Sequence, residues 1–275
     1  MGSLEAASPV NAAEAIAYLS RAPFDNVYVQ WLLESGQLDG VNAGLVWRDA
    51  VESVAGFCYF GPQVVPNADD DAAFEAFAAH AIRTGATRTF VGPRHAVERV
   101  WSFARSALSV PRAIRTSQPV YALDRAALRG SRNDADVAPA TNAEVYEITM
   151  HSATMIAGEI GLDADKRPAS AEFVRRTARI IDAGWWWRYR VDGRLAFMCN
   201  VGSATAATAQ LQGVWTPPEM RGHGHATLAL GAICDRLLEV HPTLCLYVND
   251  FNLPAIALYE RVGFFRAGEF STIFL

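Results

Sequence analysis

Apolar positions recur along the chain with two spacings, one typical of amphipathic helices and one typical of half-buried strands. The helical spacing predicts helices over residues 11–38, 70–84, 95–108, 142–159, 170–183, 224–240 and 253–261. Short alternating or continuous apolar runs predict strands at 44–47, 55–60, 87–91, 136–138, 185–191, 194–201, 208–215 and 244–248, with closing strand pairs at 113–123 and 264–275. The dipeptide Asp192-Gly193 is typical of a tight hairpin turn, because both turn positions need a positive φ.

The polar stretch 125–141 has no apolar periodicity and marks the expected domain boundary. The whole chain has 275 residues, about 1.8 times a domain of ~150 residues, which favours two domains. We therefore expect one domain over 1–130 and a second over 131–275. Both halves end in the same order of strand, helix, strand, helix and strand pair, which indicates a repeat of architecture.

Composition and charge narrow the class of protein. Hydrophobic residues make up 51% of the chain and charged residues 19%, enough apolar material for a core in each half. With 24 basic and 29 acidic residues the formal charge is -5, a poor basis for binding a phosphate backbone, so no nucleic acid partner is expected. The first ten residues lack the pattern of a secretory signal, and no apolar run reaches the ~20 residues of a membrane span, so a cytoplasmic protein without a membrane partner is expected.

Four scattered cysteines carry no sign of a shared site. They form no C-x-x-C pair and have no nearby ligand cluster. Neither structural disulfides nor a metal site are expected. The cysteines are Cys58, Cys199, Cys234 and Cys245.

The segment 217–226 carries the clearest chemical signal, because Gly222, Gly224 and Ala226 remove bulky side chains where a strand leads into a helix. Backbone N–H groups at such a junction, with the helix dipole behind them, bind phosphate or pyrophosphate. The structural alternative is an ordinary turn that contains glycine.

This segment resembles the pyrophosphate loop of the GNAT superfamily of acetyl-CoA-dependent N-acyltransferases. The family pattern Arg/Gln-x-x-Gly-x-Gly/Ala matches at Arg221, Gly224 and Ala226. The later segment 246–264 is similar to a second family signature, a strand followed by Asn, Ala and then Tyr-x-x-x-Gly-Phe. The resemblance is strong over about 136–275 and weak before it. It implies an α/β (α+β) fold of two GNAT-like domains, each a mixed, mostly antiparallel twisted sheet flanked by helices.

The resemblance also implies where acetyl-CoA binds. The strand end at 214–216 is expected to separate from the strand at 244–248 and to bind the pantetheine arm through its backbone. The loop amides are expected to bind the pyrophosphate, with Arg221 adding charge. The implied coenzyme-binding residues are Val214, Trp215, Thr216, Arg221, Gly222, His223, Gly224, His225, Ala226, Thr227, Asn252 and Tyr259.

Two of these residues have structural alternatives. The resemblance implies that Tyr259 protonates the departing thiolate as general acid, whereas an amphipathic tyrosine also packs its ring on a sheet. It implies that Asn252 bonds the pantetheine amide, whereas Asn also caps helices. The amide near Val214 or Trp215 is expected to hold the oxyanion, and direct attack by the amine is expected because no cysteine lies in these segments.

The general base is the least defined role. Many relatives use a Glu on the strand before the loop, but Gln210 and Gln212 stand there and cannot accept a proton at neutral pH. Glu159, expected in a loop after the helix 142–159, is the first substitute. His151 and Glu147 follow, although a solvated helix face also explains Glu147.

The first half of the chain lacks the glycine loop that indicates coenzyme binding in the second half. Where the second half has its glycine loop, the first has the segment 66–71 with three consecutive carboxylates, which would repel a pyrophosphate. A degenerate GNAT-like domain over 1–130 without a coenzyme site is therefore expected. The consecutive tryptophans 185–187 serve either the core or an aromatic wall of the acceptor site.

The expected function is transfer of an acetyl group from acetyl-CoA to a primary amine. The alternatives are a non-catalytic acyl-CoA sensor and an interaction module that keeps only the fold. The sequence names neither the acceptor nor the oligomeric state.

Overall fold

The computed structural model describes residues 2–38, 43–85, 89–130, 136–159 and 170–275. They group into two compact units. Unit 1 comprises the chain up to Ala122 together with Tyr247–Leu253 and Arg266–Leu275, and unit 2 comprises Leu123–Leu246 and Pro254–Phe265. Two late segments of the chain thus belong to the first unit, so neither unit is one continuous piece of sequence.

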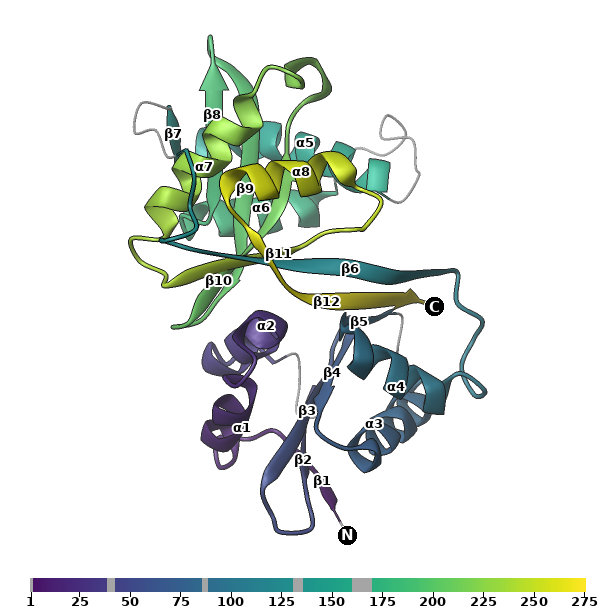
Figure 1. Cartoon of the computed structure of the whole chain (residues 1–275). Coiled ribbons are helices and arrows are strands. Elements are labelled where there is room, and N and C mark those ends of the chain that lie inside the picture. The colour runs from purple at the N-terminus through teal and green to yellow at the C-terminus, as the bar shows by residue number, and fades with distance from the viewer. Residues whose placement is uncertain (1, 39–42, 86–88, 131–135, 160–169) are drawn as a thin grey trace. The chain divides into compact units, whose positions relative to one another are not determined.

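Unit 1 is a sheet with helices on both faces (Figure 1). Its strands lie in the order β1-β2-β3-β4-β5-β12-β6, and β4 pairs parallel to β5 whereas β1 with β2, β2 with β3, β3 with β4 and β12 with β5 pair antiparallel. The elements are β1 (Ser3–Ala6), α1 (Ala12–Leu19), α2 (Pro23–Glu34), β2 (Gly44–Arg48), β3 (Val54–Phe60), β4 (Val64–Ala68), α3 (Asp71–Thr84), β5 (Thr89–Pro93), α4 (Arg94–Ala104), β6 (Ala113–Asp124) and β12 (Phe265–Phe274).

Two apolar clusters hold unit 1 together, one on each face of its sheet. Phe74 and Phe77 of α3 pack with Val97 and Val100 of α4 on one face. The cluster on the other face lies under α1 and α2 and contains Leu19 of α1. Burial of these aromatic and branched side chains supplies the main stabilisation of the unit.

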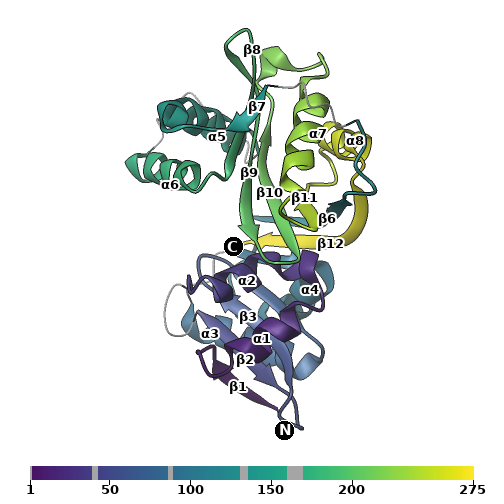
Figure 2. The same cartoon turned by 90° about the vertical axis from the view of Figure 1, so that its left-hand side faces the viewer.

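Unit 2 repeats this layout. Its strands lie in the order β11-β10-β9-β8-β7, antiparallel except for the parallel pair β10 and β11. Helices α5 and α6 lie on one side of β8–β10 and α7 lies on the other (Figure 2). The elements are β7 (Val137–Pro139), the 3-10 turn η1 (Asn142–Glu144), α5 (Val145–Glu159), α6 (Ala171–Asp182), β8 (Trp186–Val191), β9 (Arg194–Ala204), β10 (Thr208–Trp215), the 3-10 turn η3 (Pro218–Met220), α7 (His225–Leu237), β11 (Thr243–Tyr247) and α8 (Leu253–Val262).

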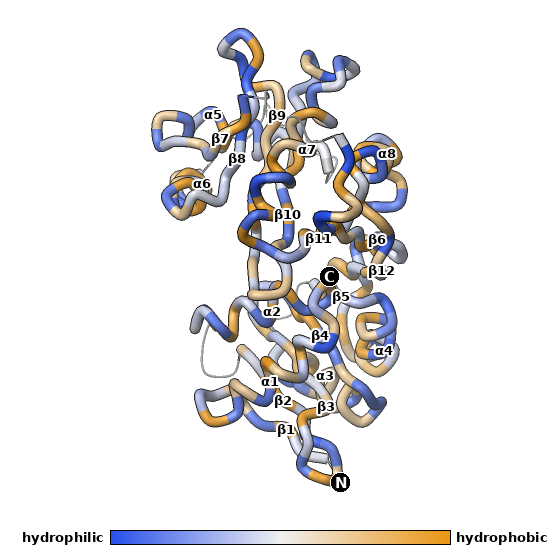
Figure 3. Tube along the Cα trace, turned by 60° about the vertical axis from the view of Figure 1, so that its left-hand side comes forward, coloured by the Kyte–Doolittle hydropathy of each residue, from blue (hydrophilic) through white to orange (hydrophobic). Residues whose placement is uncertain are grey.

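Both halves of the chain follow one order of elements. Each runs through a strand, two helices, three antiparallel strands, a helix, a parallel strand, a helix and a last strand. The predicted mixed, mostly antiparallel fold flanked by helices is therefore confirmed. The central strand β9 is almost wholly buried and mainly apolar in colour in Figure 3.

The structure corrects several predicted elements. Strand β1 was not predicted, because it has only four residues. The helical region predicted over 11–38 consists of two helices, since the chain turns at Ser20–Ala22 and Pro23 begins α2, where proline is well tolerated. The predicted closing strand pairs are the single strands β6 and β12. No helix in the described ranges has both the length and the apolarity that a membrane crossing needs.

Candidate functional site

The loop between β10 and α7 depends on two glycines in the left-handed region. Gly222 has φ 79° and Gly224 has φ 80°, a conformation that side-chain-bearing residues rarely adopt. A Cβ atom at either position would meet nothing within 4 Å. The backbone conformation, and not lack of space, therefore requires glycine here.

Helix α7 begins directly after Gly224 and has no side-chain cap. Its first turn contains no acidic residue, and the first backbone bond of the helix runs from Leu228 N to Gly224 O at 3.2 Å. The amides of the first turn have no acceptor within the helix, and the helix dipole gives this end a partial positive charge. The junction has the geometry and charge that a phosphate group needs.

Arg221 is positioned across this loop by two contacts. Its Nε donates to Thr216 O at 3.0 Å, and its guanidinium carbon lies 4.7 Å from the centre of the Trp215 ring. The two histidines that flank Gly224 stack on each other, with the His223 and His225 ring centres 5.8 Å apart. The exposed Arg221 adds a fixed positive charge beside the N-terminus of α7.

Strand β10 leaves its parallel partner halfway along its length. The two strands pair at three positions, from Thr208 with Thr243 to Gln210 with Cys245. Although β10 continues to Trp215, the described residues give it no β11 partner beyond Gln210. The predicted separation of these strands is confirmed, and it leaves the backbone of the β10 end able to pair with an extended ligand.

A bulge redirects the end of β10. The register with β9 shifts between Gln212 and Trp215, and Gly213 lies there with φ 61°. A Cβ at Gly213 would lie 2.7 Å from Asn200 Oδ1 and 3.0 Å from a ring carbon of Trp186. Only glycine fits this position, because both the φ value and the close side chains exclude any other residue.

A hydrogen-bonded amide pair stands on β10, the strand before the glycine loop. Gln212 Nε2 donates to Gln210 Oε1 at 3.0 Å, and Gln210 is buried. The side chain of Gln212 crosses Gly202, where a Cβ would lie 2.3 Å from its Cδ. Neither amide can act as a general base at neutral pH.

Tyr259 lies on α8 and is 6% exposed. Its ring centre lies 5.8 Å from that of Phe264, so the ring packs against Phe264, as the structural alternative expects. Asn252 is exposed and lies in the segment Tyr247–Leu253, which belongs to unit 1. The acid role of Tyr259 and the coenzyme contact of Asn252 stay predictions.

The three candidate bases all lie on α5 but differ in their positions and contacts. Glu159 is the last residue of α5, not a residue of the following loop as predicted, and its side chain lies outside the described residues. Glu147 accepts from Arg190 through both carboxylate oxygens, which ties α5 to β8. His151 is half-buried on the same helix. The paired Glu147 carboxylate is thus better explained as a structural anchor than as a base.

Glu144 completes this anchor at the start of α5. It accepts from Arg188 at 3.2 Å and from Arg190 at 2.8 Å, and forms a capping box with Thr141. Burial alone would raise the pKa of Glu144, but the hydrogen bonds from Thr141 and Arg190 lower it below its ordinary value. The carboxylate therefore stays ionised and holds the two arginines of β8.

None of the four cysteine thiols is suited to act as a nucleophile. All four are buried, and burial raises the pKa of the Cys199 thiol to about 12. Burial likewise raises the pKa of Cys58 and Cys234. Among the residues that the structure describes, no three His, Cys, Asp or Glu side chains gather to hold a metal ion.

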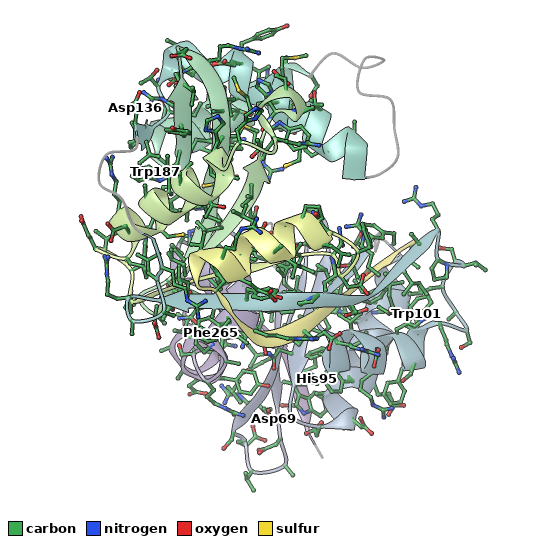
Figure 4. All side chains as sticks on the ribbon, turned by 45° about the horizontal axis from the view of Figure 1, so that its top comes forward. Asp69, His95, Trp101, Asp136, Trp187 and Phe265 are labelled. Atoms are coloured by element: carbon green, nitrogen blue, oxygen red, sulfur yellow. The ribbon has the colours of Figure 1, made fainter. Side chains whose placement is uncertain are left out.

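The corresponding junction of unit 1, between β4 and α3, is closed by its own side chains. The expected loop 66–71 is shorter than predicted, because residues 66–68 continue β4. Asp70 caps α3 by accepting from Ala73 N at 2.7 Å. Arg21 pairs with Asp69, which Figure 4 labels, at 3.1 Å, and Arg99 pairs with Asp71.

Two family models match the chain in adjacent ranges. Residues 44–148 match a domain of unknown function (DUF4081), and residues 144–264 match the Acetyltransferase (GNAT) family. No curated protein matches the chain significantly.

Solved structures share the fold over nearly the whole chain at low identity. An acetyltransferase from the GNAT family of Colwellia psychrerythraea is 13% identical with a TM-score of 0.58, and 99% of each chain is covered. A tandem GNAT protein from the clavulanic acid biosynthesis pathway is 15% identical with a TM-score of 0.57, covering 99% of this chain and 98% of that one. A GCN5-related N-acetyltransferase from Sphaerobacter thermophilus is 14% identical with a TM-score of 0.63, covering 99% and 94%. These similarities show a shared fold that includes tandem examples.

Proposed function

We propose that the protein transfers an acetyl group from acetyl-CoA to a primary amine, because residues 144–264 match the Acetyltransferase (GNAT) family model. The observation that carries the proposal is the junction before α7, where two left-handed glycines and an uncapped helix end present amides to an anion. A protein that uses acetyl-CoA is expected to work in the cytoplasm.

The coenzyme is proposed to bind along unit 2. Its pantetheine arm pairs with the β10 backbone at Val214–Thr216, where β10 has left β11. Its pyrophosphate accepts from the amides of the loop and the first turn of α7, with Arg221 beside them. The loop and helix residues in this role are Gly222, His223, Gly224, His225, Ala226 and Thr227.

Transfer is proposed to occur by direct attack. The amine nitrogen bonds to the thioester carbonyl carbon, and the resulting oxyanion accepts from an amide at Val214 or Trp215. The carbon–sulfur bond then breaks, Tyr259 protonates the thiolate, and the proton of the amine passes to a base, for which Glu159 is proposed. The buried cysteines support direct attack, since a covalent acyl-cysteine would need an accessible thiolate.

The first half of the chain is proposed to bind no coenzyme. The carboxylates of the β4–α3 junction repel phosphate, and Asp70 already occupies the end of α3. We therefore assign coenzyme binding to the domain over 131–275 and a supporting role to the domain over 1–130.

A second candidate function is a non-catalytic acyl-CoA sensor. The amide pair Gln210–Gln212 on β10 favours it, because a carboxylate base is missing from that strand. Release of free CoA thiol, measured with a thiol reagent over a panel of primary amines, separates the two. Amine-dependent release supports acetyl transfer, whereas tight acetyl-CoA binding without release on any amine supports the sensor.

A further inference from the structure

Two indole N–H groups lack hydrogen-bond partners on the α5 side of the unit 2 sheet. Trp186 is 5% exposed, and among the described residues its Nε1 has no acceptor. The same holds for Nε1 of the half-buried Trp215. Buried polar groups are nearly always paired in folded proteins, so two unpaired donors in one place call for an explanation.

The two tryptophans flank β9 on one face of the sheet, near the β10 bulge. Trp186 pairs with Asn200 of β9 and Trp215 pairs with Met198, two residues away on the same strand and therefore on the same face. Trp186 and Trp215 belong to one apolar cluster with Ile148 of α5. Both donors thus lie beside the strand end that the proposed function assigns to the thioester.

A third unpartnered group comes from the helix above them. Ser152 of α5 is 3% exposed, and its Oγ also has no partner. Ser152 follows Ile148 by four residues, which places both on one face of α5. The cluster therefore presents two donors that cannot accept and one hydroxyl that can do either, which together suit an oxygen acceptor on a ligand.

The same face carries no unpaired carboxylate among the described residues of its strands. The β10 side chains here are the amides of Gln210 and Gln212. The charged groups on this face of β8 are Arg188 and Arg190, which pair with glutamates at the start of α5. Among the described residues of these strands, no free carboxylate is therefore placed to attract an alkylammonium ion or to take its proton.

The acceptor must therefore offer an oxygen to the indole donors and must react without a strong base beside it. An α-amino group next to a carbonyl meets both conditions. With an ordinary pKa of about 8, about 10% of it is uncharged at pH 7, against about 0.04% of a lysine amine with a pKa of about 10.4. Its adjacent carbonyl supplies the oxygen that the indole donors lack. A weak base then suffices, because the amine already enters the site partly deprotonated.

We propose that the acceptor is a primary α-amine with an adjacent carbonyl, such as a peptide N-terminus, whose carbonyl oxygen accepts from Trp186 Nε1 and Trp215 Nε1. This inference rests on the proposed acetyl transfer. Both nitrogens are covered by neighbouring atoms in this conformation, so side chains around them shift as the acceptor enters. The reaction is the one balanced above, with the α-amine nitrogen as the nucleophile and the CoA thiol as the leaving group.

The test compares two peptides with the full-length protein at pH 7. One has a free N-terminus and no lysine, and the other differs from it only in a blocked N-terminus and one internal residue changed to lysine. Release of CoA thiol gives kcat/KM, and mass spectrometry locates the acetyl group. We expect the free N-terminus to be preferred by at least about 100-fold, in line with the ratio of uncharged amine.

Variants Trp186→Phe and Trp215→Phe keep one aromatic ring and remove the pyrrole ring with its N–H donor, so the control must lose the same atoms. Each should lower kcat/KM for the free N-terminus about tenfold, mainly through KM, and Trp186→Phe should leave acetyl-CoA binding unchanged, because the proposed coenzyme site does not use Trp186. Trp187→Phe is the matched control, because Trp187 also has an unpartnered Nε1 among the described residues but follows Trp186 directly on β8 and so points to the opposite face. It should leave kcat/KM unchanged.

Faster transfer to the lysine peptide would overturn the inference and leave acetyl transfer standing. Equal effects of Trp187→Phe and of the two test variants would also overturn it, since only a general packing role would then be supported. Failure of both peptides alongside transfer to other amines would exclude the proposed acceptor, and failure of every amine would overturn acetyl transfer itself.

Discussion

The junctions before α3 and before α7 occupy the same place in the repeated order of elements, yet they carry opposite chemistry. At α3, Asp70 caps the helix and its neighbours Asp69 and Asp71 pair with arginines. At α7, Gly224 leaves the helix end uncapped and no carboxylate lies in the first turn. A helix end satisfied by its own chain needs no ligand, whereas an uncapped end with left-handed glycines suits one.

The comparison separates fold from binding. Both junctions join antiparallel strands to a helix followed by a parallel strand, so the layout alone does not decide whether a phosphate binds. Whether a phosphate binds depends on a few residues, which are carboxylates at the α3 junction and glycines at the α7 junction. The strand before each helix adds a second difference. Among the described residues, β10 has a bulge at Gly213, whereas β4 pairs with β3 without a shift of register.

Copying the unit 1 chemistry into unit 2 should have the largest effect. Gly224→Asp places a carboxylate at the start of α7, where Asp70 stands at α3. We expect acetyl-CoA affinity to fall by at least about 100-fold, because a like charge ~4 Å from a phosphate costs that much at a partly exposed site. Calorimetric titration measures the loss.

The matched control is Gly224→Asn, which has the same shape without the charge and tolerates the left-handed region. It should bind clearly more tightly than Gly224→Asp. Equal losses of affinity in the two variants would assign the effect to backbone strain. They would contradict the claim that the carboxylate charge repels the coenzyme.

The next largest effect is expected at Tyr259, on the helix α8 that follows the parallel strand β11. Tyr259 lies on α8, whereas α4, which follows β5 in unit 1, contains no tyrosine. If Tyr259 protonates the thiolate, Tyr259→Phe should lower kcat about 100-fold. Steady-state rates with thermal melting as a folding control check this, and an unchanged kcat would assign Tyr259 to packing against Phe264.

A smaller effect should follow from removing the unit 1 cap. Asp70→Ala should destabilise the protein by about 0.5–2 kcal/mol, the usual value of an N-cap. Asp70→Asn keeps the cap and removes the charge, so it should be nearly as stable as the wild type. Denaturant unfolding measures both, and acetyl-CoA binding should be the same in all three proteins.

The smallest effect is a pH dependence of unit 1. His80 of α3 is buried and its Nδ1 accepts from Arg83 Nη2 at 2.9 Å. Burial, followed by the nearby Arg83 charge, lowers the pKa of His80, so between the lowered value and about 6.5 only the unfolded chain takes up the proton. Stability should therefore decrease as pH falls below about 6.5. His80→Gln should reduce this decrease in Tm, and an unaltered pH profile would contradict it.

The sequence predicted the repeated order of elements because most helices and strands have clear apolar periodicity. It predicted the α7 junction because glycines and Arg221 lie together in the chain. It could not predict that the last strand belongs to unit 1, since strand pairing between distant segments leaves no local pattern. Nor did it predict the unpartnered indoles, although Gly213 inside a strand pattern is typical of a bulge and marks the place.

The central claim is that the chain has one coenzyme site, at the α7 junction. Calorimetric titration of the full-length protein with acetyl-CoA tests it most directly, run in parallel on the wild type, Asp70→Ala and Gly224→Asp. We expect one site per chain with micromolar affinity in the first two proteins and its loss in the third. Two sites per chain, no binding to the folded wild type, or full affinity in Gly224→Asp would contradict it.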